Sequence, residues 1–191
     1  MTAVAELPEA VTRYLDAVVA AIEEDVAVVE AYVIGSAAVG DFDPATSDLD
    51  VVVVIDRPLG AERPRLVRRV ARLEPPGRGL ELVLYVAGSQ PPDYELNVNE
   101  GEERPDEPSF WFVLDAAVAQ ERSRPLQAGR PWGELFEPVA EHAVRAAMRE
   151  SLAWSERQPP DDQFARLNAI RARHYLEHGE WISKRRAQEL S

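Results

Sequence analysis

Apolar residues along the first two thirds of the chain recur with two spacings, and each spacing predicts a type of element. Helical spacing predicts amphipathic helices over residues 8–28, 62–73 and 110–121. Runs rich in β-branched residues predict strands over residues 29–34, 51–55, 80–86 and 94–98. The run at 51–55 is unbroken, which indicates a strand buried on both faces.

The last third of the chain has only the helical spacing. Helices are predicted over residues 139–156, from about 162 to 178, and from 183 onward. Ala143, Ala146, Ala147 and Leu152 are expected on the apolar side of the first. Asp161 or Asp162 can cap the second, which ends at Gly179. Residues 126–132 contain Gly129 and Pro131 and predict a link, so we expect domains over 1–130 and 131–191.

Composition narrows the class of protein. The chain has 191 residues, 46% of them hydrophobic and 29% charged, which is typical of a soluble globular protein. No run reaches the roughly 18 apolar residues of a membrane span, and the first ten residues do not resemble a signal peptide, so we expect no membrane association. The absence of cysteine excludes disulfides and thiolate chemistry and fits a cytoplasmic protein.

The net charge of −13 limits the partners. Such a chain repels the phosphates of a nucleic acid, and no basic stripe offsets this repulsion, so we expect no nucleic-acid partner. The field of an acidic protein instead concentrates small cationic ligands.

The strongest chemical motif lies between the first two predicted strands. The first strand ends in Gly35-Ser36, and Ser47-Asp48-Leu49-Asp50 stands at the start of the second. Side chains alternate along a strand, so Asp48 and Asp50 point to the same side and repel each other unless a cation lies between them. A hard divalent ion such as Mg²⁺ prefers such oxygens. The alternative is a surface turn with two solvated aspartates.

This arrangement resembles the motif of the nucleotidyltransferase superfamily, which has the polymerase-β-like fold. The resemblance implies an α/β (α+β) fold with a small mixed sheet flanked by helices, followed by a small all-helical C-terminal domain. It also implies ATP as co-substrate and Mg²⁺ held by Asp48 and Asp50. We expect a short helix over residues 36–39, whose backbone N–H groups and Ser36 hydroxyl contact phosphate. Ser36 could also serve as a helix N-cap.

A third carboxylate lies in the third predicted strand. Glu81 stands in an apolar run, where an unpaired carboxylate costs several kcal/mol. If this strand lies beside the Asp-x-Asp strand, Glu81 faces the same metal-bound phosphate and matches the third carboxylate of the superfamily. In the aminoglycoside branch of the superfamily, Glu81 resembles the general base. The alternative is that Glu81 lies on an exposed edge or pairs with an arginine. The acidic segment over residues 100–108 is expected to be a solvated loop, and the alternative is that it helps to hold a polycationic ligand.

The helical part resembles aminoglycoside 3''-adenylyltransferases, through the segments 134–139, 165–179 and 181–184. The resemblance implies that Gly35, Ser36, Ser47 and Lys184 bind the nucleotide. It implies that Asp161, or the neighbouring Asp162, binds the aminoglycoside. Lys184 is the only lysine of the chain, and a compact ammonium suits a triphosphate. Its alternative is a solvated helix lysine.

Two departures from that family bear on these expectations. The family's streptomycin-packing tryptophan has no counterpart after the third strand, because Trp111 falls later, on a predicted helix. The family also continues with further helices beyond the Lys184 position, so the helical domain is expected to be short. The expected reaction is AMP transfer in a cleft between the domains. A nucleotide sensor without turnover, and an enzyme that modifies a protein or another small molecule, remain alternatives.

Overall fold

A computed structural model describes residues 7–126 and 129–191. The chain forms two compact units. The sheet unit holds Met1–Glu107 and Val118–Pro138, and the helical unit holds Pro108–Ala117 and Val139–Ser191. The division into two domains over residues 1–130 and 131–191 stays a prediction.

The sheet unit is built on one mixed sheet of six strands in the order β5-β4-β3-β2-β1-β6. Its strands are β1 (Val28–Ile34), β2 (Leu49–Ile55), β3 (Leu80–Val86), β4 (Leu96–Asn99), β5 (Glu102–Glu103) and β6 (Arg124–Pro125). Only β2 and β3 run parallel, and the other neighbouring strands are antiparallel. Its helices are α1 (Glu9–Glu23), α2 (Gly35–Val39), α3 (Arg63–Val70) and the 3₁₀ turn η1 (Trp132–Glu134).

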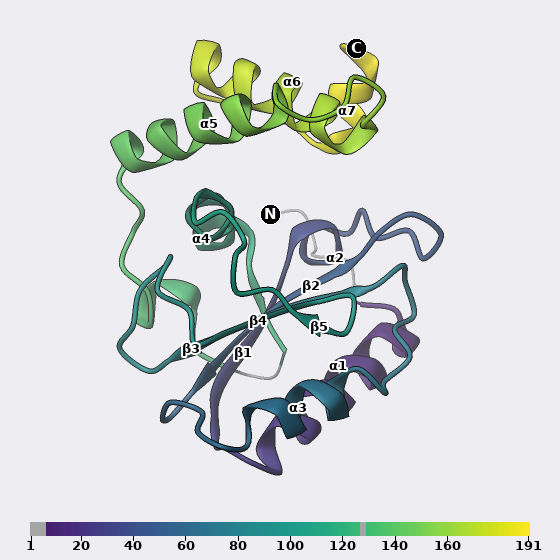
Figure 1. The fold of residues 1–191 in the computed structure, drawn as a ribbon, viewed down its shortest axis with the longest axis vertical. Helices are drawn as coiled ribbons and strands as arrows, with labels where there is room; N and C mark the ends of the chain where they lie inside the picture. The colour runs from purple at the N-terminus through teal and green to yellow at the C-terminus, as the bar shows by residue number, and fades with distance from the viewer. Residues whose placement is uncertain (1–6, 127–128) are drawn as a thin grey trace. The chain divides into compact units, whose positions relative to one another are not determined.

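One face of this sheet, the closed face, is apolar along its whole length. Alternate residues of the central strands point to it and pack with α1 and α3, which cover this side (Figure 1). Its buried strand residues are Ala31, Val33, Leu49, Val51, Val53, Ile55, Leu80, Leu82, Leu84, Leu96 and Val98. Residues 51–55 are all buried, as expected from their unbroken apolar run.

The other positions of the same strands form the second face, which we call the carboxylate face. Tyr32 and Tyr85 lie on it and make edge contacts with Trp132 and Phe136, at ring-centroid distances of 5.3 and 5.4 Å. Trp132 and Phe136 stack on each other at 4.3 Å. Part of the predicted link over residues 126–132 is therefore packed core of the sheet unit.

Helix α1 ends at Glu23, five residues earlier than the apolar spacing predicts. The chain turns at Asp25, whose carboxylate accepts hydrogen bonds from Arg65 and Arg69 of α3, the latter at 2.8 Å. This side chain is only 1% exposed. The ion pairs tie α3 to the turn between α1 and β1.

Residues 100–108 are not simply a solvated loop. Asn99 and Glu102 pair across a two-residue turn at Glu100 and Gly101, which joins β4 to β5 as a hairpin. Both turn residues have positive φ, 52° and 77°, as a type I′ turn requires. Arg63 of α3 also contacts this hairpin, because its Nη1 donates a hydrogen bond to Glu103 at 3.0 Å.

The helical unit contains the first part of α4 (Phe110–Arg122), with α5 (Glu141–Ser155), α6 (Gln163–His178) and α7 (Lys184–Glu189). Its core consists of Phe110, Leu114, Ala117, Val144, Ala147, Met148, Ala172 and Tyr175. Ala147 is buried as expected, whereas Ala146 is exposed. Helix α5 therefore turns its Val144 and Met148 side inward. Within residues 7–126 and 129–191, no helix is both long and apolar enough to cross a membrane.

Candidate active site

Asp50 and Glu81 are direct neighbours on the carboxylate face. Strands β2 and β3 run parallel with Asp50 opposite Glu81, and paired residues of adjacent strands point to the same face. Strand β3 is an inner strand between β2 and β4, so the alternative that Glu81 lies on an exposed edge is wrong. Both side chains are partly exposed, as a ligand requires.

Gly35 brings the backbone of the first turn against Asp50. Strand β1 ends at Ile34, which pairs with Asp50 across the sheet. Gly35 has a φ of +64°, and a Cβ atom there would lie 1.8 Å from Asp50 Oδ2. Only glycine accepts both the conformation and the contact. The Asp50 carboxylate therefore lies in space that any other residue at position 35 would fill.

Ser36 is the second residue of α2, whose N-cap is Ile34. The alternative that Ser36 caps this helix is therefore wrong. Its backbone carbonyl accepts hydrogen bonds from the N–H groups of Gly40 and Asp41, and Gly40 ends the helix at a φ of 82°. The phosphate-binding role of the Ser36 hydroxyl stays a prediction.

Ser47 and Asp48 directly precede β2, and this segment lies beside the residues that precede β3. The Ser47 carbonyl accepts from Arg78 N–H at 3.0 Å, and Leu49 N–H donates to the Gly79 carbonyl at 3.0 Å. The Ser47 hydroxyl accepts from Asp43 N–H at 3.1 Å and so holds the loop before β2. Asp48 is 26% exposed, and its Oδ1 lies 3.9 Å from Arg78 Nε.

Asp48 and Asp50 stay the predicted magnesium ligands at this end of the sheet. The described part of the chain has no group of three or more His, Cys, Asp or Glu side chains placed to hold a metal. Mg²⁺ does not need one, because it is commonly held by one or two carboxylates while phosphate and water supply its other ligands. Asp48 and Asp50 offer two carboxylates, and the Cβ-free space at Gly35 accommodates the second of them.

Two polar neighbours of the carboxylates were not predicted from the sequence. Asn99 of β4 lies opposite Glu81, and its side-chain amide donates to Glu81 Oε1 at 3.2 Å. Arg78 lies beside Asp48. The signal for Asn99 was available, because Asn97 and Asn99 alternate with Val98 and so put two amides on one face of a strand.

Tyr32 is another titratable side chain on the carboxylate face, and we asked whether it could act as a base. Its hydroxyl donates to the Arg130 carbonyl at 2.9 Å, and burial, with Glu30 nearby, raises the pKa of Tyr32 to about 12. Tyr32 therefore stays protonated at neutral pH and is not a candidate base.

The family comparison matches this part of the chain. Residues 15–103, which include β1 to β5 and both carboxylates, match the family model described as nucleotidyltransferase domain. This region of the chain is therefore similar to nucleotidyltransferase domains. The match spans Gly35, Asp50 and Glu81, the residues that the geometry brings together.

The fold of the whole chain is also found in a solved structure. The chain is similar to a spectinomycin adenyltransferase from Enterococcus faecialis, whose crystal structure was determined with ATP and spectinomycin. The two are 18% identical, the likeness covers 94% of this chain and 79% of that chain, and the TM-score is 0.74. The predicted nucleotidyltransferase fold with C-terminal helices is thus confirmed. No curated protein matches the sequence.

The remaining predicted residues lie outside the nucleotidyltransferase domain, in the helical unit. Asp162 is the N-cap of α6, where its Oδ1 accepts from Ala165 N–H at 3.0 Å. With the exposed Asp161 it lines a hollow of about 240 Å³. Lys184 is the first residue of α7, and its Nζ lies 5.6 Å from the centre of the Phe164 ring. The roles of these three residues in binding stay predictions.

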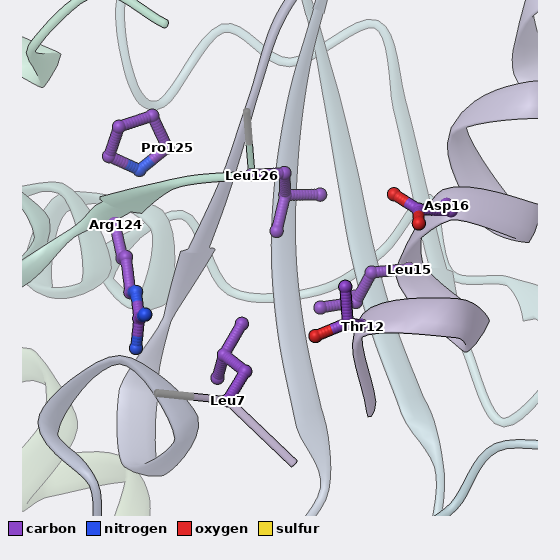
Figure 2. Close-up of a pocket in the computed structure, with 7 residues that line it drawn as sticks. All are labelled: Leu7, Thr12, Leu15, Asp16, Arg124, Pro125 and Leu126. Carbon is purple, nitrogen blue, oxygen red and sulfur yellow. The ribbon is translucent and has the colours of Figure 1, made fainter. Parts of the chain in front are cut away.

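The sheet unit also has a cavity of about 280 Å³ (Figure 2). Neither Asp50 nor Glu81 lines it. It is lined from the α1 side by Leu7, Thr12, Leu15 and Asp16, and from the β6 side by Arg124, Pro125 and Leu126. None of these seven residues belongs to the predicted site. In Figure 2 the Asp16 and Arg124 side chains lie on different sides of the cavity, so they do not form one charged group.

Proposed function

We propose that this protein transfers AMP from ATP to a hydroxyl group of a small cationic acceptor, an aminoglycoside, and releases pyrophosphate. The observation that carries the proposal is the pair Asp50 and Glu81, in register on adjacent strands of a nucleotidyltransferase domain, with Gly35 against Asp50. This pair combines a metal-binding carboxylate with a neighbouring candidate base.

Asp48 and Asp50 are the residues that would hold magnesium. A bound Mg²⁺ ion would neutralise charge that develops on the triphosphate. Gly35 leaves room for the Asp50 carboxylate, because a Cβ atom at this position would fill the space that the carboxylate occupies. The hydroxyls of Ser36 and Ser47 are proposed to contact the phosphates.

Glu81 is the proposed general base. Its carboxylate takes the proton of the acceptor hydroxyl, the acceptor oxygen forms a bond to the α-phosphorus of ATP, and the bond from that phosphorus to the bridging oxygen breaks. Pyrophosphate leaves with that oxygen, and we propose that the Lys184 ammonium stabilises it. A positioned base typically contributes about 10²- to 10⁴-fold to the rate.

The charge of the chain supports a cationic acceptor. The net charge is −13, and Asp161 and Asp162 line one hollow of the helical unit. We propose that these two carboxylates contact amino groups of the acceptor. The similar adenyltransferase was crystallised with spectinomycin, which supports including that compound among the acceptors tested.

Mass spectrometry tests the proposal. A panel of aminoglycosides, including spectinomycin and streptomycin, is incubated with the protein, ATP and Mg²⁺. We expect one compound to gain an adenylyl group, and Glu81→Gln to reduce the gain by about 10²-fold or more. Glu9→Gln is the matched control, because Glu9 is 85% exposed at the start of α1 and we expect its loss to leave the transfer unchanged.

The negative outcomes are distinct. If ATP binds but no compound gains mass, aminoglycoside transfer is wrong and a nucleotide-binding role is favoured. If the added mass appears on a protein in the mixture, the acceptor class is wrong although the chemistry stands. If Glu81→Gln transfers AMP as fast as the unmodified protein, Glu81 is not the base.

A further inference from the structure

We infer that Asn99 is a positioning residue that holds the Glu81 carboxylate in its reactive orientation. The inference rests on the proposed function, because it presupposes that Glu81 takes the acceptor proton. It adds a residue that is absent from the Gly-Ser and Asp-x-Asp motif.

The hydrogen bond from Asn99 fixes a torsion of the Glu81 side chain that rotamer preferences leave undetermined. The last torsion of a glutamate side chain is broad and nearly two-fold, so packing of the stem does not fix the plane of the carboxylate. Asn99 Nδ2 donates to Glu81 Oε1 at 3.2 Å, from a residue directly opposite in the sheet. A fixed donor on one oxygen restricts that rotation and fixes where the second oxygen points.

The backbone of Asn99 is itself held on both sides. It pairs with Glu81 of β3 and with Glu102 of β5. It is also the last residue before the type I′ turn at Glu100 and Gly101, whose positive φ values set the hairpin register. A donor on a strand that is paired on both edges is placed more accurately than one on a loop.

The charge of the donor also suits the site. Asp50 lies directly opposite Glu81, so a further carboxylate at position 99 would add repulsion. A lysine or arginine there would form an ion pair with Glu81 and compete with the acceptor for its oxygens. A neutral amide orients the carboxylate and does neither.

Asn97 offers a natural contrast on the same strand. It points to the same face as Asn99, is 5% exposed, and its Nδ2 donates to the Arg104 carbonyl at 3.2 Å. Its hydrogen bond therefore joins two backbone segments and touches neither carboxylate. Two asparagines two residues apart thus have different expected roles, one in stability and one in orientation.

The test compares steady-state kinetics of four variants, using ATP, Mg²⁺ and the acceptor that gains mass in the assay above. Asn99→Ala and Asn99→Asp remove the donor, Asn99→Gln keeps an amide, and Asn97→Ala is the structural control. We expect the first two to lower kcat about 10- to 100-fold while KM for ATP stays within about twofold. Asn99→Gln should restore part of kcat. Asn97→Ala should lower Tm and leave kcat of the folded protein unchanged.

The contrary outcomes separate the two proposals. If the unmodified protein transfers AMP and Asn99→Asp keeps its kcat, the positioning role is wrong and the proposed function stands. If the Asn99 variants lower Tm as Asn97→Ala does, and lose activity only in proportion to the fraction that is unfolded, the residue is structural and the inference fails. If the unmodified protein transfers AMP to no acceptor, Glu81 is not a base and both proposals fail.

Discussion

The two faces of the central sheet are made by the same strands but perform different tasks. On the closed face, Leu49, Val51 and Leu82 are at most 1% exposed and pack with α1 and α3. One position further along, the side chains of the other face include Asp50 and Glu81. Because the side-chain period of a strand is two, a single run of residues supplies both a core and a site.

The carboxylates that form the candidate site lie at one end of the strands. Further along the carboxylate face, Tyr32 and Tyr85 are covered by Trp132 and Phe136, and Asn97 is a buried polar side chain. Asp50 and Glu81 lie near the point where β1 ends and where β2 and β3 begin. These two carboxylates thus lie where their side chains keep contact with solvent.

The largest expected effect on stability comes from the closed face. Leu82→Ala removes a fully buried side chain from the middle of β3 and should lower the free energy of unfolding by about 2–5 kcal/mol. Urea denaturation measures this loss. The folded fraction should keep its kcat, because Leu82 points away from Glu81. A specific loss of kcat without loss of stability would contradict the division between the faces.

A smaller effect is expected from the contact between Gly35 and Asp50. Gly35→Ala should lower kcat about 10²-fold, because the new Cβ displaces the Asp50 carboxylate by an ångström or more. Gly88→Ala is the matched control, since Gly88 also has a positive φ, +90°, but a Cβ there would meet nothing within 4 Å. Both variants carry a backbone strain of about 1–2 kcal/mol, measurable in thermal unfolding. Equal kcat values for the two would show that the contact is unimportant.

The next prediction concerns Asp25, a buried aspartate on the side of the sheet that α1 and α3 cover. We expect this residue to contribute to stability and not to activity. Hydrogen bonds from Arg65 and Arg69 lower the pKa of Asp25, so its stabilising effect is present above the unfolded value of about 3.9 and is lost as pH falls through the folded value. Asp25→Asn should lower Tm at neutral pH, by a margin that shrinks below about pH 4. Melting curves against pH measure it. A margin that does not change with pH would contradict the ion-pair account.

The smallest effect is expected at the hairpin that carries Asn99. Glu100 has a φ of 52°, a conformation that costs about 1 kcal/mol for a residue with a side chain. Glu100→Gly should therefore raise the stability by roughly this amount, because its contact with Arg104 at 3.8 Å is exposed and contributes little. Thermal unfolding checks the sign. A destabilised variant would show that the turn is not strained.

Much of the sheet unit could be predicted from the sequence, because its main strands are continuous apolar runs. The range predicted for the third strand, residues 80–86, is the observed β3, and the Gly-Ser turn, the short helix and the Asp-x-Asp strand lie where expected. The neighbouring positions of Asp50 and Glu81 were predicted only conditionally. They depend on which strands pair, which local pattern does not encode.

The features that the sequence analysis did not predict share a physical cause, because each depends on contacts between segments that are distant in the sequence. The Glu100-Gly101 turn lacks the Asn-Gly or Asp-Gly pair that usually marks a hairpin, so the acidic composition suggested a loop. Helical spacing continued past Glu23, but Asp25 turns the chain through its arginines on α3. Nothing local distinguishes Asn99 from Asn97, because only the register with β3 puts one of them beside Glu81.

Calorimetric titration with ATP tests most directly the claim that the polar end of the carboxylate face is a magnesium–nucleotide site. Three proteins are compared in Mg²⁺ and in EDTA, namely the unmodified chain, Asp50→Asn, and Asp25→Asn as a variant with the same change in net charge. We expect ATP binding that requires Mg²⁺, is weakened at least about 10-fold by Asp50→Asn, and is unchanged by Asp25→Asn. Equal affinity of Asp50→Asn and the unmodified protein, or undiminished binding in EDTA, would contradict the account.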